Sequence, residues 1–244
     1  MSAVEPPTYA RIAELARTVH GAPEAEFGPD QVLRRMTESA VEILPGVDYA
    51  GVTLVTRSDR NGRPELASTA ETGPIARQFD DLQHEYGDGP CFEAIWQERT
   101  VGIADVETEV RWPELMHAVR ERTPIRSTLS IQLYVGDREL GALNLFAASP
   151  NAFDQKNRDL ARVLATHAAI ALSSARRGQQ FRSALASRDI IGQAKGMIME
   201  RYRVDAVRAF EIIRQLSQES NIPVAEVAVQ IVAAEEVGDR EPTS

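Results

Sequence analysis

The sequence of 244 residues predicts an α+β fold, in which an antiparallel sheet with helices is connected by a long helix to a small three-helix bundle. Apolar residues recur at helical spacing before residue 45, alternate with polar residues between 49 and 147, and return to helical spacing after Asp154. Hydrophobic residues form 43% of the chain and charged residues 26%, which fits a globular protein and excludes fibrous and disordered classes.

Two helices are predicted first, at residues 8–20 and 29–44, and the pair Pro45-Gly46 ends the second. The region that follows reads as strands, and its clearest feature is a hairpin that turns at Gly136-Asp137. Its predicted elements are strands at 49–56 and 65–70 with a turn at Asn61-Gly62, a turn at 87–90 in a mixed segment, a strand at 100–103, a helix at 112–121, and strands at 127–135 and 139–147.

A long helix is predicted from Asp154, which is suited to the N-cap position, with a bend at Gly178. Its stripe of small and apolar side chains fits either packing on the sheet or a dimer seam, and the sequence leaves both open. Three short helices complete the chain: one from about Ser187 to Tyr202, one after the N-cap Asp205, and one from Pro223 to about Glu236.

The charge distribution makes the C-terminal part of the chain the expected site for nucleic acid. The chain has a formal net charge of −9, whereas residues 176–214 hold nine basic and four acidic side chains. Basic regions attract phosphate and acidic regions repel it. The single cysteine excludes an intrachain disulfide, and with no signal peptide and no apolar run of about 20 residues we expect a cytoplasmic protein that does not cross a membrane.

Sequence patterns for catalysis are missing, so we expect no enzyme activity and no metal site. The chain contains no phosphate loop ending in Lys-Ser/Thr, no His-Glu-x-x-His and no Gly-x-Ser-x-Gly. Cys91 follows Gly89-Pro90 at the start of a predicted helix, where a thiol can become reactive. The alternative, which we favour, is that Cys91 is a small buried apolar residue.

The first of the three short helices has two distinct faces. Its apolar face comprises Ile190, Ile191, Ala194, Met197, Ile198 and Tyr202, and its second face is a stripe of Arg188, Gly192, Lys195 and Met199, with Gly196 beside it. Each interior glycine costs about 1 kcal/mol relative to alanine, so we expect the backbone of a partner to approach there. Lys195 is one of only two lysines among 27 basic residues, which suggests a need for a compact ammonium group.

The other two short helices are predicted to complete a small core. The second helix would bury Ala209, Phe210, Ile213 and Leu216, and the third would add Val224, Val227, Ala228, Ile231 and Val232. We expect Phe210 to belong to this core rather than to stack on a base. So small a bundle should depend on the connecting helix or on a second subunit for stability.

Residues 187–232 resemble the ANTAR domain, the RNA-binding module of bacterial transcription antiterminators. The resemblance rests on residues 191–196 (IGQAKG) with Met199, on Ala209-Phe210, and on Arg214 with Leu216-Ser217. It implies a homodimer that binds paired RNA stem-loops with six-base loops and prevents a terminator hairpin from forming, so that RNA polymerase is affected only indirectly. Carried over by position, the RNA surface comprises Gln193, Lys195, Gly196, Met199, Arg214 and Ser217, and the charge argument adds Arg188 and Arg201.

Residues 27–175 resemble a GAF domain, a sensor fold with a six-stranded antiparallel sheet. This resemblance rests on strand order, on residues 86–91 (YGDGPC), on 111–113 (RWP) and on 141–146 (GALNLF). No cofactor is expected, and the signal would come from a small molecule or a partner protein, unless the domain serves only for dimerisation. The expected segments are an N-terminal helix (1–26), the sensor (27–175), a connecting and dimerisation helix (154–186), the ANTAR domain (187–236) and a tail (237–244), with Cys91 as the candidate sensor residue.

Two other functions remain as alternatives. A DNA-binding regulator would use residues 219–223 as the turn of a helix-turn-helix, but the third short helix offers few side chains that read bases. A thiol-dependent GAF enzyme that reduces methionine sulfoxide would benefit from a second, resolving thiol, which this chain lacks.

Overall fold

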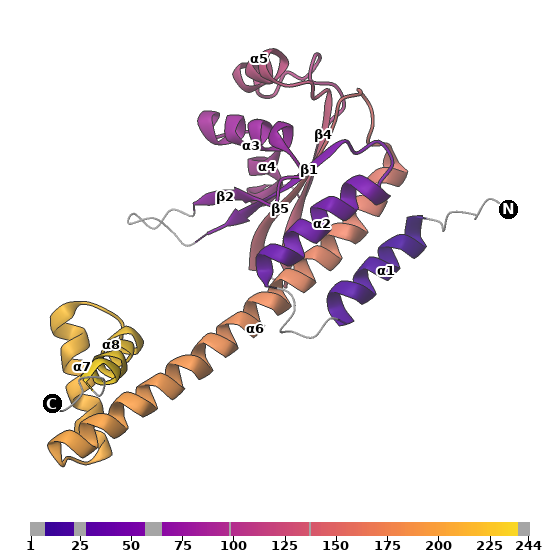
Figure 1. Ribbon diagram of the computed structural model, residues 1–244. Helices are drawn as coiled ribbons and strands as arrows, with labels where there is room; N and C mark the ends of the chain where they lie inside the picture. Colours follow the sequence, from indigo (N-terminus) through magenta and orange to yellow (C-terminus); the bar gives the residue numbers. More distant parts are fainter. Residues whose placement is uncertain (1–7, 22–27, 57–64, 98, 137, 239–244) are drawn as a thin grey trace. The chain divides into compact units, whose positions relative to one another are not determined.

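The computed structural model describes residues 8–21, 28–56, 65–97, 99–136 and 138–238. The chain forms two compact units, which divide between Arg176 and Arg177. The elements of the first unit are α1 (Thr8–Gly21), α2 (Pro29–Ile43), β1 (Tyr49–Val55), β2 (Leu66–Thr69), α3 (Pro74–Tyr86), α4 (Pro90–Trp96), β3 (Thr100–Ile103), α5 (Pro113–Arg122), β4 (Ser127–Val135) and β5 (Arg138–Ala147). The helix α6 (Gln155–Tyr202) runs from the first unit into the second, which also contains α7 (Ala206–Ser220) and α8 (Val224–Gly238) (Figure 1).

The sheet of the first unit confirms the predicted α+β class. Its strand order is β2-β1-β5-β4-β3, and all its neighbouring strands are antiparallel. The described residues therefore form five strands, one fewer than the six that the GAF resemblance implies. The predicted hairpin of β4 and β5 is confirmed, with Val135 opposite Arg138, whereas the predicted turn at Asn61-Gly62 lies outside the described residues.

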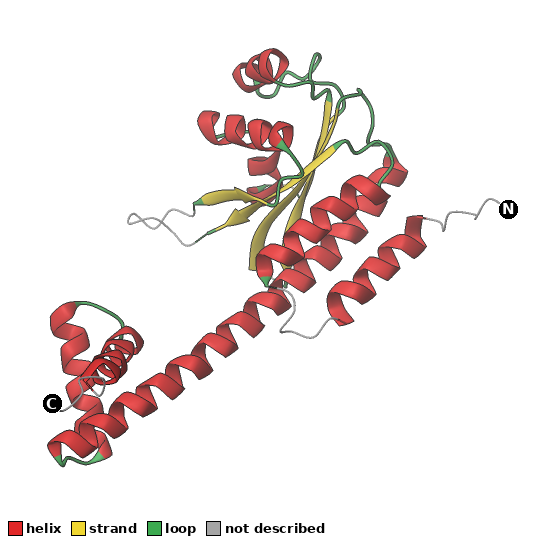
Figure 2. Ribbon diagram, in the orientation of Figure 1, coloured by secondary structure: helices red, strands yellow, loops and turns green. Residues whose placement is uncertain are grey.

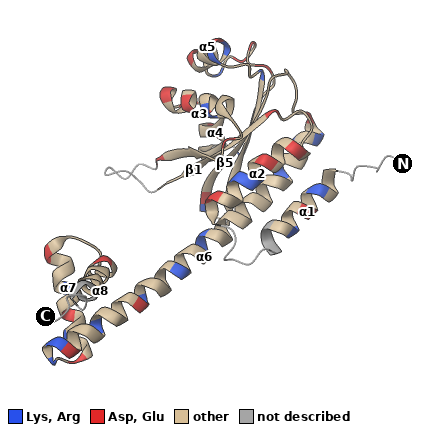
Figure 3. Ribbon diagram, in the orientation of Figure 1, with Lys and Arg blue, Asp and Glu red and all other residues tan. Residues whose placement is uncertain are grey.

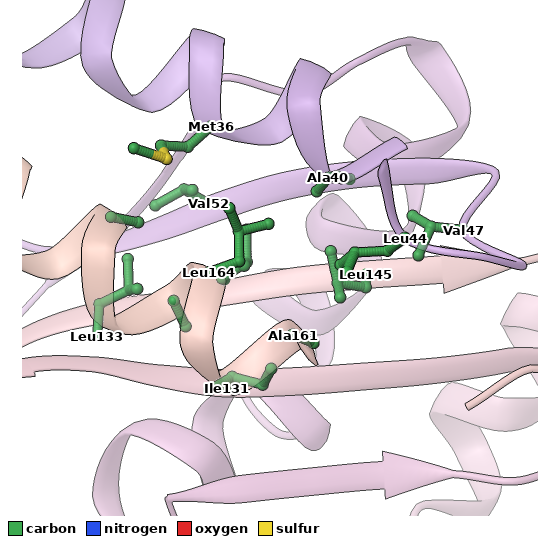
Figure 4. Packing of buried hydrophobic residues seen from close by; sticks show 14 of the residues in the cluster. Met36, Ala40, Leu44, Val47, Val52, Ile131, Leu133, Leu145, Ala161 and Leu164 are labelled. Carbon is green, nitrogen blue, oxygen red and sulfur yellow. The ribbon is translucent and has the colours of Figure 1, made fainter. Parts of the chain in front are cut away.

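Helices cover both faces of this sheet (Figure 2). On one face, α2 and α6 pack onto β1, β4 and β5 through side chains such as Met36, Val52 and Leu164, all inaccessible to solvent (Figure 4). On the other face, α3, α4 and α5 enclose a second cluster that includes Phe79 and Phe146. The mixed segment 74–98 thus contains two helices, and the sequence does not reveal α3 because it buries polar residues on its inner side.

One glycine is required by the approach of two strands. Gly141 on β5 lies opposite Leu54 on β1 and has a φ of +147°. A Cβ atom at this position would overlap the carbonyl oxygen of Thr53. Only glycine combines this backbone conformation with so close a neighbouring strand.

The helix α6 begins as predicted and is longer than predicted. The side chain of Asp154 accepts a hydrogen bond from the amide of Asn157 over 2.7 Å, which confirms the N-cap. The helix then continues through Gly178, where the sequence predicts a bend, without interruption. The segment 187–202 is therefore the C-terminal end of α6 and not a separate helix, because a single glycine costs too little to interrupt helix-forming neighbours.

The second unit has a small core made by α6, α7 and α8. Its fully buried side chains are Ala194, Ile198, Ala209, Ile213, Val227 and Ala228. The predicted N-cap Asp205 is confirmed, since its carboxylate accepts from the amide of Arg208 over 2.8 Å. The predicted burial of Phe210 and Leu216 is wrong, because they are 41% and 42% exposed, and Tyr202 on the predicted apolar face is 61% exposed. Three short helical segments can enclose only the innermost side chains of each helix.

Candidate functional site

The stripe predicted on the first C-terminal helix lies on the exposed side of α6. Successive residues of an α-helix are separated by 100°, so Arg188, Lys195 and Met199 fall within about 40° of one another. Arg188 and Met199 are exposed, and Lys195 is half-buried. Neither Arg188 nor Lys195 forms an ion pair with the part of the chain that the structure describes. Their charges are therefore available to a ligand. Figure 3 shows that several Lys and Arg positions recur along α6.

Two glycines lie along the same exposed side of α6. A Cβ atom added to Gly192 or Gly196 would meet nothing within 4 Å. Alanine would fit at both positions and stabilise the helix by about 1 kcal/mol each. No contact within the described chain therefore explains the glycines, which leave a bare stretch of helix backbone beside Arg188 and Lys195.

The predicted residues of α7 have different environments. Arg214 is exposed and lies one helical turn from Phe210, which is also exposed. Ser217 already forms a hydrogen bond within the protein. Its hydroxyl donates to the carbonyl oxygen of Ile222 over 2.6 Å and so stabilises the turn between α7 and α8. The Ser217 oxygen can still accept a hydrogen bond from a ligand, but its hydrogen is already used.

The structure separates two of the predicted residues from the stripe. Gln193 is turned by about 160° from Lys195 around the helix axis, and Arg201 by about 120°. Four of the eight predicted residues therefore belong to the exposed side of α6: Arg188, Lys195, Gly196 and Met199.

One basic residue just beyond the end of α6 was not predicted. Arg203 directly follows α6, is exposed, and has a φ of +53°. This left-handed conformation is unfavourable for arginine and usually occupied by glycine or asparagine at a helix end. Because Arg203 lies outside α6, helical spacing in the sequence does not assign it to the stripe.

The first unit contains a chain of buried polar groups between its sheet and α3. Asn144 on β5 accepts from Ser130 on β4 over 2.9 Å and donates to Thr53 on β1 over 3.0 Å. It also donates to Asp80 on α3 over 3.1 Å. Burial, followed by repulsion from Glu71, raises the pKa of Asp80 to about 8, so this acid holds its proton at neutral pH.

Cys91 ends this chain of groups and is buried, in agreement with the apolar alternative. It is 1% exposed, and its backbone amide donates to Gln83 over 2.9 Å. Burial, followed by the neighbouring Asp80, raises the pKa of the thiol to about 12. A nucleophilic role requires a thiolate, which these surroundings disfavour. The residues that the structure describes include no cluster of three or more His, Cys, Asp or Glu that could hold a metal ion.

The fold and the exposed stripe define a sensor-type domain followed by a helical nucleic-acid-binding module, and comparison with known families agrees. The profile of the GAF domain matches residues 28–173, and that of the ANTAR domain matches residues 179–232. The chain belongs to the GAF domain family and carries an ANTAR domain after the GAF domain. A search of curated proteins finds no match to it.

Solved structures share the fold of the first unit. The GAF domain of a phosphoenolpyruvate-protein phosphotransferase from Coxiella burnetii is 20% identical, with a TM-score of 0.53 over 71% of this chain and 96% of that one. A GAF sensor protein from Burkholderia vietnamiensis is 16% identical, with a TM-score of 0.52 over 73% and 99%. The free methionine-R-sulfoxide reductase of Neisseria meningitidis is 18% identical, with a TM-score of 0.50 over 70% and 90%. Identities this low establish a common fold only.

The two domains together identify the class of function. An ANTAR domain makes the chain an RNA-binding regulator of transcription antitermination, and the GAF domain is its sensor. This combination indicates a regulatory rather than an enzymatic protein, and the buried Cys91 gives no support to reductase chemistry. None of the helices in the described ranges is both long and apolar enough to cross a membrane.

Proposed function

We propose that this protein, as a homodimer, binds a pair of RNA stem-loops with six-base loops in a nascent transcript and so prevents a terminator hairpin from forming. The observation that carries the proposal is the exposed side of α6. There Arg188 and Lys195 lie beside Gly192 and Gly196, two glycines that no contact within the described chain requires. The paired stem-loops and the dimer are the parts of the proposal that need direct measurement.

The stripe has the chemistry that loop RNA requires. Proteins recognise loops through splayed bases and backbone phosphates rather than by inserting a helix into a groove. Lys195 and Arg188 would contact phosphates, and the bare backbone at Gly196 would let the RNA strand come close. Met199, which is 36% exposed, offers an apolar surface to an unstacked base.

The remaining proposed contacts would extend the surface around the helices. Arg214 and Ser217 would act from α7, where Arg214 is free to reach a phosphate and Ser217 can accept a hydrogen bond. Gln193 and Arg201, which lie on other sides of α6, would contact a separate part of the RNA. In a target with two stem-loops, Gln193 and Arg201 could contact a part of the RNA that the stripe does not reach.

A line of exposed apolar side chains on α6 supports the homodimer. Val163, Phe181 and Leu185 are all exposed, and their spacings of eighteen and four residues place them on one side of a helix. A second copy of α6 would bury them in a two-stranded coiled coil. The small residues of the same helix, such as Ala168 and Ala169, are instead buried against the sheet. Packing on the sheet and a dimer seam therefore use different sides of α6.

The test uses the full chain with an RNA that carries two hexaloop hairpins, the same RNA with one hairpin, and duplex DNA. We expect salt-dependent binding to the paired hairpins and a loss of about tenfold or more in Lys195→Ala, which removes one charged contact. Lys156→Ala is the matched control, because Lys156 is the other lysine and is exposed on the first unit. Molecular mass measured in the same samples tests the dimer. Equal binding by Lys195→Ala and the unmodified protein, or preference for duplex DNA, would contradict the proposal.

A further inference from the structure

A groove lies along the open edge of the sheet in the first unit, on the side where α6 packs. The edge strand β3 has four residues and β4 has nine, and their pairing ends with Thr100 opposite Ile131. Beyond that pair, the amide of Gln132 donates to the carbonyl of Arg99 over 3.0 Å. The rest of β4 extends past β3, and α6 forms the other wall of a hollow of about 520 Å³. Pockets of this size accommodate small molecules.

Two arginines give the groove a positive charge in a chain whose net charge is negative. Arg99 and Arg162 line it, and among the described residues no aspartate or glutamate does so. The guanidinium of Arg99 lies 4.3 Å from the centre of the Tyr134 ring and donates to the Tyr134 hydroxyl over 2.9 Å. Arg162 donates to the Thr100 hydroxyl over 3.3 Å, and its Nη1 lies 3.8 Å from Oδ1 of Asp159 in an exposed ion pair. These contacts position both guanidinium groups while leaving most of their five donors available.

Five of the lining residues of the groove are apolar: Ile131 and Val135 from β4, and Ala165, Ala169 and Ile170 from α6. Thr166 also lines the groove from α6, and its hydroxyl already donates to the carbonyl of Arg162 over 2.9 Å. A ligand suited to this groove therefore has a charged end and an uncharged, apolar body.

A smaller hollow of about 310 Å³ adjoins the groove and shares Arg99 with it, but its lining is mostly polar and includes Glu139. On the face of the sheet opposite α6, Phe79 and Phe146 are in ring contact, with centroids 4.9 Å apart, and both are buried. The buried polar groups around Asn144 fill the adjoining interior. The groove between β4 and α6 is thus distinct from that packed interior.

We infer that this groove binds a small anion with an apolar body, whose carboxylate or phosphate group is held by Arg99 and Arg162. The wall of the groove is α6, the same helix that later carries Arg188 and Lys195. An occupant would therefore contact the helix that links the two units of the chain. The inference concerns binding to the first unit and stands independently of the proposed RNA target.

The test is a fluorescence titration of the full chain with anilinonaphthalene sulfonate, an aromatic anion, and with N-phenylnaphthylamine, its uncharged analogue. We expect saturable binding of the sulfonate at one site per chain, at least about tenfold tighter than binding of the uncharged analogue, because charge-assisted hydrogen bonds contribute most. The double variant Arg99→Gln/Arg162→Gln should weaken sulfonate binding by about tenfold or more. Arg122→Gln, which removes an exposed arginine from α5, should leave it unchanged.

A second variant controls for the possibility that the double variant loses binding because it misfolds. Thr166 is exposed on α6, so Thr166→Glu should fold normally, place a carboxylate on the groove wall and also weaken sulfonate binding. Displacement of the probe by benzoate or by inorganic phosphate then identifies which kind of anion the groove prefers, and either one supports the inference. Unchanged sulfonate affinity in both the double variant and Thr166→Glu, or equal affinity for the charged and uncharged probes, would overturn it.

Discussion

The side-chain amide of Asn144 donates a hydrogen bond to Oδ1 of Asp80 over 3.1 Å and thereby joins β5 to α3 inside the sensor domain. The same oxygen accepts from Gln83 over 3.1 Å, whereas Oδ2 of Asp80 has no hydrogen-bond partner in the described residues. Such an acid is retained in the folded state as a neutral group, because ionising it would bury a charge without compensation. The consequence is a pH-dependent stability.

The variant Asp80→Asn should remove this pH dependence. Unfolded Asp80 loses its proton near the ordinary pKa of 3.8, whereas folded Asp80 holds it until a pKa of about 8. The unfolded state thus binds fewer protons between about pH 4 and pH 8, so stability falls as pH rises through that window. The gain in Tm on substitution should be larger at pH 8 than at pH 5, with about 2–4 °C for each kcal/mol. Calorimetry of the full chain measures it, and equal Tm differences at both pH values would contradict the assignment.

Cys91 should be unreactive in the folded protein. With a pKa of about 12, roughly one thiol in ten thousand is ionised at pH 8, and the side chain is also inaccessible. An aromatic disulfide reagent should therefore modify Cys91 only after denaturant is added. Thiol-dependent reduction of methionine sulfoxide by the native protein, abolished in Cys91→Ser, would show instead that the thiol takes part in chemistry.

The substitutions Gly192→Ala and Gly196→Ala should have opposite effects on stability and on RNA binding. Each alanine fits without a clash and should stabilise α6 by about 1 kcal/mol. If RNA approaches the helix backbone there, the added methyl groups should weaken binding to the paired hairpins severalfold. Thermal unfolding and RNA titration of the same samples measure both effects. Variants that are more stable and bind equally well would show that the glycines serve no RNA contact.

Arg203→Gly should likewise separate stability from binding. Glycine removes the cost of the left-handed conformation, about 1–2 kcal/mol, so the Tm should rise. Loss of the guanidinium should lower RNA affinity and make the salt dependence less steep by about one unit of slope. Asn221→Gly is the matched control, because Asn221 also has a positive φ but its side chain carries no charge. An unchanged salt slope in Arg203→Gly would exclude a phosphate contact.

The periodicity of apolar residues predicted the helices and strands whose buried faces are apolar. It failed for a helix whose buried face contains polar residues. The strands and α2, α5 and α7 follow from alternating or helical patterns that the structure confirms. The helix α3 was hidden because Asp80 and Gln83, both polar, occupy its inner side. Phe210 and Leu216 show a different limit: periodicity gives the direction of a buried face but not its width, which depends on how many neighbouring helices cover it.

Helical periodicity also predicted part of the candidate RNA-binding site. The stripe through Arg188 and Lys195 follows from helical spacing, which the continuous helix preserves. That Ser217 would be engaged by the carbonyl of Ile222 depends on the path of the turn after α7, which side-chain patterns do not specify. The groove beside Arg99 depends on β3 ending before β4, and strand ends are set by pairing between segments distant in sequence.

The close approach of β5 to β1 at Gly141 has a consequence for how this domain tolerates sequence change. In a library that samples every amino acid at single positions, Gly141 should accept no replacement, because any Cβ atom would meet the Thr53 carbonyl. Gly136 also has a positive φ, but the space around it is open, so asparagine or aspartate should survive selection there. Variation across homologous sensor domains should therefore be permitted at the tip of this hairpin and forbidden five residues further on.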